Sequence, residues 1–383
     1  GAVALALLLT VGAGLLARSY TALLPVTQGF ESSGVLTVSI QLVGGRYDSS
    51  AVLTSFDAQL LERIRAMPGV ESAAIGSSLP LTGLGWTSDF SVQGRARDDF
   101  ATEVAHREVS PDYFKAMHVP LLHGRTFTDA DVRGAERVVI VNDALVRKYF
   151  RGADPLGQRI AFDRVPDSSS KWRTIVGVVG GEHQLGVAQE SHDEILAPLA
   201  QDQQQSIVVF VRADGEPLAL VDPIRGALRD IDPNLAIESV RTMDDVVGES
   251  LARDRFLMTM LTVFAGVGLT LAIVGVYGVL AQMTRRRTRE MGVRIALGAQ
   301  GGQLRWLVIS QGLRLVAAGL VLGALLALML TRAMQRVLFD VPASDPLTYV
   351  LVALLLAATG AVAAWLPALR ASGTDPAVAL RAD

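Results

Sequence analysis

The sequence of 383 residues contains no cysteine, which excludes disulfide bonds, thiolate metal sites and cysteine nucleophiles. Lysine is almost as scarce, since the chain has only Lys115, Lys148 and Lys171. An ATP-binding loop of the Walker type needs Gly-Lys-Ser/Thr, in which backbone amides and the lysine surround the phosphates. No lysine here follows a glycine. The chain therefore cannot bind ATP through that motif.

Other catalytic and metal-binding patterns are also missing. The segment from Gly248 to Ala252 lacks the second glycine of a nucleophile elbow, and the segment from Asp129 to Gly134 lacks the oxygen ligands of a calcium loop. No His-Glu-x-x-His array is present, and we expect each histidine at the surface or in a turn: His106, His118, His123, His183 and His192. We therefore expect no catalytic residue, no metal site and no cofactor.

Charge is distributed unevenly in a chain that is 50% hydrophobic and 19% charged. From Phe256 onward it has eleven arginines and five acidic residues, whereas the part before Phe256 has 24 basic and 33 acidic residues. A mildly acidic part followed by an apolar, arginine-rich part is typical of a water-exposed domain ahead of a membrane domain. We expect a lipid bilayer as surroundings and no nucleic-acid partner.

Four apolar stretches are long enough to be membrane spans, which need about 20 residues. They cover residues 1–17, 256–281, 306–330 and 347–366. The first is at the short end of this range, so we interpret it as a transmembrane helix truncated at its cytoplasmic side. The core of a signal peptide is the alternative. Arg314 interrupts the third stretch near its start, which places it at the interface or at the end of an interfacial helix.

The connecting loops predict the orientation, because lysine and arginine are retained on the cytoplasmic side. Residues 284–305 carry six arginines against Glu290 alone, whereas residues 332–346 balance two arginines with two aspartates. The arginine-rich loop is therefore expected inside the cell. Residues 18–255 then lie outside and residues 256–383 form the membrane domain with a cytoplasmic tail. Arg18 argues weakly against this orientation.

The outer region has the pattern of an α+β domain. Residues 35–42 alternate as a strand, and a helix capped by Asp48 or Ser49 follows with apolar residues at helical spacing. Further strands are expected at 70–75, 137–142, 174–179 and 207–211, helices at 143–150 and 217–230, and loops at 163–172 and 181–202. The predicted fold is a membrane α-helical bundle of four transmembrane helices with an inserted α+β extracytoplasmic domain.

Small residues recur at four-residue spacing in the spans. They are Gly268 and Ala272, then Gly319, Gly323 and Ala327, then Gly360 and Ala364. Such a face lets helix backbones approach closely, within the chain or across a dimer. The alternative is that glycine and alanine are simply frequent in these segments.

The cytoplasmic loop contains a short amphipathic pattern. Glu290 and Arg294 are four residues apart in the order that favours a helix, Met291 and Ile295 share an adjoining face, and Gly298 can end the helix. A charged amphipathic helix between two spans can dock into a groove on another protein. The arginines can equally be a cytoplasmic anchor with no partner.

Several segments resemble the permeases of MacB/FtsX-type ABC transporters. The cytoplasmic pattern Thr288-Arg-Glu-Met-Gly-Val-Arg-Ile-Ala-Leu-Gly-Ala299 resembles their coupling segment. The resemblance extends to Asp345-Pro-Leu-Thr348, the tail from Leu366 to Arg381, and the outer segments 109–117, 120–125, 139–145 and 175–180. The chain is most similar to the second half of the duplicated permeases. Leu366 to Arg370 is less basic than the family's usual tail.

The resemblance implies a permease that transmits ATP-driven motion to the outer domain and exports a substrate without a channel through the spans. Its implied partners are a separate ABC ATPase subunit, a second permease unit and further periplasmic or outer-membrane components. The implied ATPase-coupling residues are Arg289, Glu290, Met291, Arg294, Ala296 and Gly298. The alternative from another class is a membrane-tethered binding or scaffold protein without an ATPase. A membrane enzyme is disfavoured by the missing motifs.

Overall fold

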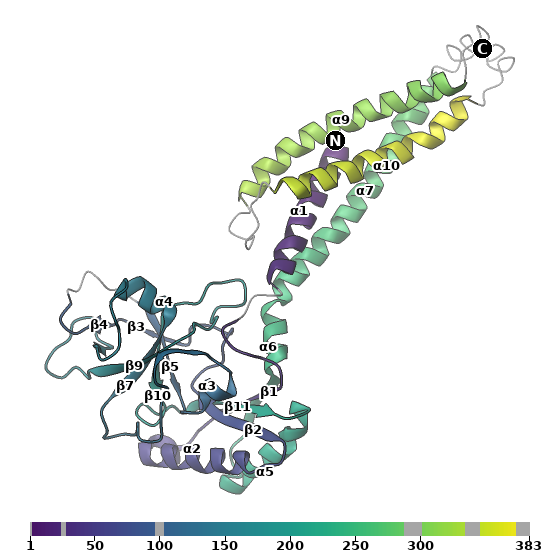
Figure 1. Cartoon of the computed structure of the whole chain (residues 1–383). Coiled ribbons are helices and arrows are strands. Elements are labelled where there is room, and N and C mark those ends of the chain that lie inside the picture. The colour runs from purple at the N-terminus through teal and green to yellow at the C-terminus, as the bar shows by residue number, and fades with distance from the viewer. Residues whose placement is uncertain (1, 24–27, 96–102, 287–300, 334–344, 373–383) are drawn as a thin grey trace. The chain divides into compact units, whose positions relative to one another are not determined.

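The computed structural model describes residues 2–23, 28–95, 103–286, 301–333 and 345–372 (Figure 1). The chain forms two compact units: an outer unit, residues 26–252, and a membrane unit, residues 1–25 together with 253–383. The outer unit is thus inserted into the sequence of the membrane unit after its first helix.

The outer unit is built on one mixed sheet, with twelve strands among the described residues. Its strands are β1 (Val35–Gln41), β2 (Val70–Gly76), β3 (Trp86–Ser88), β4 (Ser91–Val92), β5 (Val104–Val109), β6 (Leu121–Gly124), β7 (Val138–Asn142), β8 (Arg159–Ala161), β9 (Arg173–Val179), β10 (Glu194–Pro198), β11 (Ser206–Ala213) and β12 (Ile237–Thr242). Their order is β12-β1-β11-β2-β5-β10-β7-β9-β8-β4, with β3 also paired to β5 and β6 to β9. The pairs β5–β10 and β7–β9 are parallel, and the other pairs are antiparallel.

Two apolar cores stabilise the outer unit. In the first, α2 (Ser50–Arg65) and α5 (Val221–Ile231) pack on β1, β2 and β11, with Leu60, Ile64 and Ile224 fully buried. In the second, β7, β9 and β10 pack against α4 (Asp143–Leu145) and the π-helical segment η3 (Val146–Phe150). Figure 1 shows α2 and α5 on the same face of the sheet. The α+β prediction is confirmed.

The remaining helical segments of the outer unit are short. They are η1 (Gly45–Asp48), α3 (Tyr113–Ala116), η4 (Pro217–Leu220) and α6 (Met243–Ser250). The helix expected at 217–230 is therefore a 3-10 turn that continues as α5, because Pro217 begins the turn without needing a backbone N–H.

The loop predicted at 181–202 is wrong in part, because it contains β10. This strand lies between β5 and β7, and all five of its residues are buried. The loop is predicted because residues 181–202 are polar and poorly periodic, and Glu194 at the start of β10 is one of the charged residues there. Its carboxylate is paired with Arg107, a residue 87 positions earlier, so the strand can be buried with its charge.

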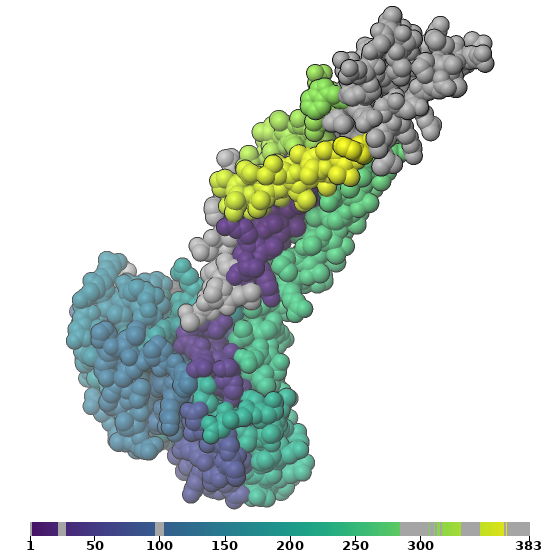
Figure 2. Space-filling model, turned by 45° about the vertical axis from the view of Figure 1, so that its right-hand side comes forward, coloured from purple at the N-terminus to yellow at the C-terminus, as the bar shows by residue number. Residues whose placement is uncertain are grey.

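The membrane unit contains four helices long and apolar enough to cross a membrane. They are α1 (Ala2–Leu23), α7 (Ala252–Arg286), α9 (Gly301–Ala333) and α10 (Pro346–Ser372). Each extends beyond its apolar stretch, since helical hydrogen bonding continues through the polar residues that flank a span. Figure 2 shows α10 lying along α9. Helix α9 passes through Arg314 without a break, so no interfacial helix ends there.

Candidate functional site

Helix α1 packs closely against the other three helices at glycines. A Cβ atom on Gly268 of α7 would lie 3.4 Å from the Cα of Ala6, and one on Gly323 of α9 would lie 3.0 Å from the Cα of Ala4. On α1 itself, a Cβ on Gly14 would lie 2.9 Å from the Cγ2 of Thr348 in α10. At Gly323 the helix backbones approach to a distance that a larger residue would not allow, whereas an added Cβ at Gly268 would make an ordinary contact with the backbone of Ala6.

The other predicted packing residues occupy similar places. A Cβ on Gly319 would lie 2.7 Å from the Cβ of Val3, and one on Gly360 would lie 2.6 Å from the Cγ2 of Val316. Ala272 and Ala327 are buried among the apolar side chains of the bundle. The side chain of Ala364 lies outside the described residues.

Two other glycines of α7 have no such neighbours. At Gly266 and Gly278 of α7, an added Cβ would meet nothing within 4 Å. Close approach therefore depends on position, and it occurs where another helix of the bundle faces the glycine.

The expected ATPase-coupling residues cannot be placed. Arg289, Glu290, Met291, Arg294, Ala296 and Gly298 all lie in residues 287–300, outside the described residues.

Arg18, which argued weakly against the predicted orientation, has an acidic partner within the membrane unit. Its guanidinium pairs with the carboxylate of Asp345, the residue before α10. The paired charges reduce the cost of placing an arginine near the end of an apolar helix.

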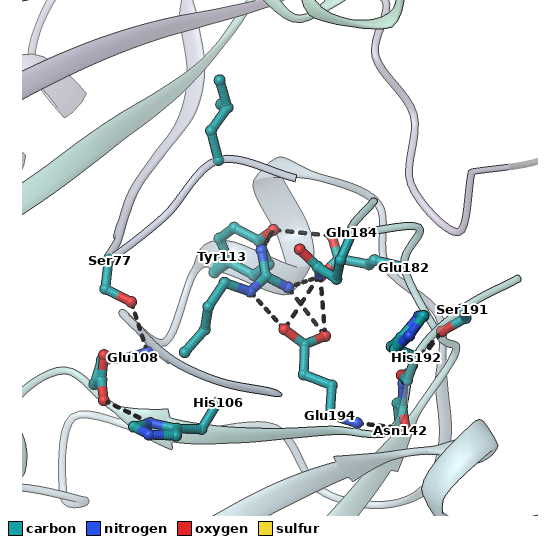
Figure 3. A network of polar contacts seen from close by, with 12 residues as sticks. Ser77, His106, Glu108, Tyr113, Asn142, Glu182, Gln184, Ser191, His192 and Glu194 are labelled. Carbon is teal, nitrogen blue, oxygen red and sulfur yellow. Dashed lines mark hydrogen bonds and ion pairs between the residues drawn. The ribbon is translucent and has the colours of Figure 1, made fainter. Parts of the chain in front are cut away.

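The outer unit contains a fully buried ionic network, which we call the Arg107 network. Arg107 of β5 donates from Nε to Oε1 of Glu194 at 2.7 Å and from Nη1 to the hydroxyl of Tyr113 at 2.9 Å, and it also pairs with Glu182. Gln184 donates to both oxygens of Glu194 at 3.2 and 3.3 Å. Figure 3 shows Tyr113, Glu182, Gln184 and Glu194 pointing toward one another.

The charges in the Arg107 network do not balance, since two carboxylates surround one guanidinium. Burial raises the pKa of Glu194, although the guanidinium opposes this effect. Burial alone would lower the pKa of Arg107, but the carboxylates of Glu182 and Glu194 raise it well above its usual value. The arginine is therefore permanently charged, and the burial of Glu194 favours the protonated form of its carboxyl group.

The loop that carries Glu182 and Gln184 also borders an open groove of about 660 Å³. Arg147 and Lys148 line one side of the groove, and residues 189–193 line the other. Lys148 donates to Asp193 at 2.5 Å, and Asn142 donates to the carbonyl of His192 at 2.6 Å. The buried network thus fixes one end of the loop, and these polar contacts fix the other.

The rejected sequence motifs have structural roles. Asp131 accepts hydrogen bonds from Arg125 at 2.7 and 2.9 Å, and the hydroxyl of Ser250 accepts one from the amide of Val187. Among the described residues, no three or more acidic or histidine side chains are grouped to hold a metal ion.

One histidine differs from the prediction that all five lie at the surface or in turns. His106 is in β5, where its ring stacks on Phe162 with the centroids 4.8 Å apart. Its side chain is only 17% exposed. Stacking on the ring of Phe162 covers one face of the imidazole, so that His106 can be largely buried within a strand.

Comparison with known proteins identifies the family. Residues 1–227 match the MacB-like periplasmic core domain, and residues 262–376 match the FtsX-like permease C-terminal domain. The chain belongs to the MacB/FtsX family of ABC transporter permeases. It is a multi-pass protein of the inner membrane with a large extracytoplasmic domain.

The similar proteins include two longer exporters. The pyoverdine export ATP-binding/permease protein PvdT of Pseudomonas putida is 25% identical over 279 residues, 69% of this chain and 41% of that protein. The macrolide export ATP-binding/permease protein MacB of an Azoarcus species is 25% identical over 284 residues, 71% of this chain and 42% of that protein. The chain thus spans about two-fifths of the length of these relatives.

One solved structure is similar to part of the chain. The periplasmic region of MacB from Actinobacillus actinomycetemcomitans has a TM-score of 0.40 and 14% sequence identity, with 59% of this chain and 95% of that chain covered.

Proposed function

We propose that this permease transmits ATP-driven motion from the cytoplasmic side of the membrane to its outer domain, for the export of a substrate. The observation that carries the proposal is the place of the outer domain in the chain. It is inserted between α1 and α7, and these two helices are its covalent links to the membrane unit. A helix is stiff over the roughly 30 Å of a bilayer, so displacement of one end moves the other.

The energy comes from a separate ATPase in this proposal. The chain lacks a Walker lysine, and its relatives PvdT and MacB bear names that combine ATP-binding and permease functions. We take the matched two-fifths of those proteins to be a permease part, because residues 262–376 of this chain match the FtsX-like permease domain. The segment Arg289 to Gly298 is the proposed contact with the ATPase, and a second permease unit completes the transporter.

The glycine contacts supply a mechanical argument for the same proposal. Helix α1 touches α7 at Gly268, α9 at Gly323 and α10 through Gly14. With so little side-chain material between the backbones, the helices have little freedom to shift independently. We propose that these residues and their neighbours Ala272 and Ala327 hold the bundle together while it moves.

The test is to reverse one charge in the proposed contact. Arg294→Glu should abolish most of the copurification of the ATPase, or stop the permease from stimulating ATP hydrolysis, because an inverted charge at a partly desolvated contact is strongly unfavourable. Arg305→Glu is the matched control, since it makes the same change eleven residues further along the chain, near the start of α9.

Unchanged association and unchanged stimulation by Arg294→Glu would assign the loop arginines to anchoring alone. If the unaltered chain brings down no ABC ATPase at all, the membrane-tethered scaffold becomes the better description.

A further inference from the structure

The start of α10 and the outer end of α1 share a polar contact. The carboxylate of Asp345 accepts hydrogen bonds from the amide of Thr348 at 3.0 Å and from its hydroxyl at 2.5 Å, which caps α10. The same oxygen pairs with the guanidinium of Arg18 on α1. The Asp345 side chain is 11% exposed and that of Arg18 is 47% exposed. One buried carboxylate therefore both begins α10 and holds α1.

A second contact lies one helical turn away along α1 and again involves Thr348 of α10. Gly14 precedes Arg18 by four positions, so the two lie on one face of α1. A Cβ on Gly14 would be 2.9 Å from the Cγ2 of Thr348, whose residue is 5% exposed. Asp345 and Thr348 thus meet Arg18 and Gly14 in a compact joint, which we call the α1–α10 joint.

The opposite end of α1 is fastened elsewhere. Near its start, the backbone of Ala4 lies against Gly323, and Val3 lies against Gly319, both in α9. Helix α1 is therefore held by α9 at one end and by α10 at the other. The outer domain follows directly after the end that α10 holds.

We propose that Arg18 and Asp345 are positioning residues that fasten α1 to α10, so that these two helices move as one body when the bundle rearranges. This rests on the proposed function. It adds that motion of α10, which has no covalent link of its own to the outer domain, reaches that domain through the α1–α10 joint. An ion pair suits this task because its strength depends on direction and distance.

The test is disulfide formation between Gly14→Cys and Thr348→Cys. Since a carbon–carbon bond is about 1.5 Å long, the two Cβ atoms would be no more than about 4.4 Å apart, within the range that a disulfide allows. The chain has no native cysteine to interfere. The rate of cross-linking with copper phenanthroline is measured in membranes, with the copurified ATPase, in the absence of nucleotide and with a non-hydrolysable ATP analogue.

The expected result is fast cross-linking that does not change with nucleotide. Gly360→Cys with Val316→Cys provides the reference pair, because these residues form an equally close contact between α10 and α9. Cross-linking of the joint that slows about tenfold with the ATP analogue would show that the two helices separate during the cycle, and this would overturn the proposal.

The role of the ion pair is tested in the same double-cysteine background. Asp345→Asn keeps a side chain that can cap α10 but removes the charge, and Arg18→Gln removes the partner charge. Each should slow cross-linking about fivefold and make it respond to nucleotide, and Arg18→Lys should restore most of the rate. A variant that only destabilised the protein would not make the cross-linking rate depend on nucleotide.

Two results separate this proposal from the proposed function. If Arg18→Gln leaves the rate unchanged, the ion pair does not fasten the helices and the proposal fails, even where the ATPase is bound and stimulated. If no ATPase copurifies, the proposed function fails, and the effect of Arg18→Gln on cross-linking in the permease alone still decides whether the ion pair fastens α1 to α10.

Discussion

The outer unit buries a charged network completely, whereas the ion pair between Arg18 and Asp345 in the membrane unit lies at helix ends with Arg18 half exposed. The outer unit has two cores of apolar side chains, and Tyr113 of its network packs edge-on against Phe210 with the ring centroids 5.2 Å apart. The membrane unit brings helix backbones together at glycines. In lipid, apolar side chains gain little by leaving their surroundings, so close backbone contact replaces the hydrophobic effect.

This comparison predicts that the two units respond to different substitutions. In the outer unit, removal of a charged partner should be the most damaging change, because the remaining charge stays buried. In the membrane unit, an added methyl group should be the most damaging change, because the helix backbones have no room for it.

The largest effect is expected from Arg107→Met, which leaves Glu182 and Glu194 buried without their cation. Loss of one partner of a buried ion pair costs about 3–5 kcal/mol. We expect urea unfolding of the outer unit, followed by the fluorescence of Trp86 and Trp172, to show this loss. Adding Glu182→Gln and Glu194→Gln to the same variant should restore much of the stability, since no charge of the Arg107 network then remains buried. A loss below about 1 kcal/mol in the single variant would contradict this account.

The next effect concerns Asp57 on α2, whose residue is 8% exposed and whose Oδ1 has no hydrogen-bond partner among the described residues. Burial raises the pKa of Asp57 to about 7. A raised carboxyl pKa means that folding favours the protonated form. Its contribution to stability is therefore complete below about pH 4 and is lost as the pH rises to about 7.

Asp57→Asn keeps the shape and removes the titration. We expect it to stabilise the outer unit by up to about 3 kcal/mol at pH 8 and to have little effect at pH 4. The measurement is the difference in free energy of unfolding between the variant and the unaltered protein across this range. A difference that does not grow with pH would show that Asp57 is not titrating. Asp48→Asn, at an exposed position, is the control.

In the membrane unit, Gly323→Ala tests the backbone contact. Its new methyl group would lie 3.0 Å from the Cα and the carbonyl oxygen of Ala4. Overpacking of this kind costs about 1–3 kcal/mol. Gly278→Ala is the matched control, because it faces open space on α7 and alanine favours a helix by up to about 1 kcal/mol over glycine. The midpoint of thermal unfolding in detergent should fall for the first and not for the second; equal behaviour would contradict a contact specific to Gly323.

The sequence predicts well where one local pattern decides the structure. The strand predicted at residues 35–42 and the helix predicted after it are both found. Each is specified by the spacing of its own apolar residues, which face a neighbouring core. The four apolar spans are found as helices for the same reason. The ends of these helices were less accurate, since polar residues such as Arg18 continue the helix once a partner is present.

The Arg107 network could not be predicted from the sequence. Strand β5 has His106, Arg107 and Glu108 in succession, which is typical of an exposed segment, yet Arg107 and Glu108 are 1% and 3% exposed. Arg107 finds its carboxylates 75 and 87 positions away. The spacing of residues within one segment carries no information about a partner at that distance. The sequence therefore does not predict β5 and β10 as buried strands.

The smallest effect is expected at two helix starts that use the same chemistry in the two units. Thr242 caps α6 in the outer unit by accepting from the amide of Asp245 at 3.1 Å, and Asp245 accepts in return from the amide of Thr242 at 3.2 Å. Asp345 and Thr348 form a similar cap on α10 in the membrane unit.

Thr242→Ala removes the cap on α6 and should cost about 1 kcal/mol, whereas Thr242→Ser keeps the accepting hydroxyl and should cost little. The free energy of unfolding of the outer unit in urea measures both. On α10, Asp345→Ala should cost more than Thr242→Ala in thermal unfolding of the membrane unit, because the same carboxylate also holds Arg18 and its loss leaves that guanidinium unpaired near the end of α1. If Asp345→Ala costs no more than Thr242→Ala, the cap accounts for the whole contribution of Asp345, and the ion pair adds nothing to the stability of the bundle.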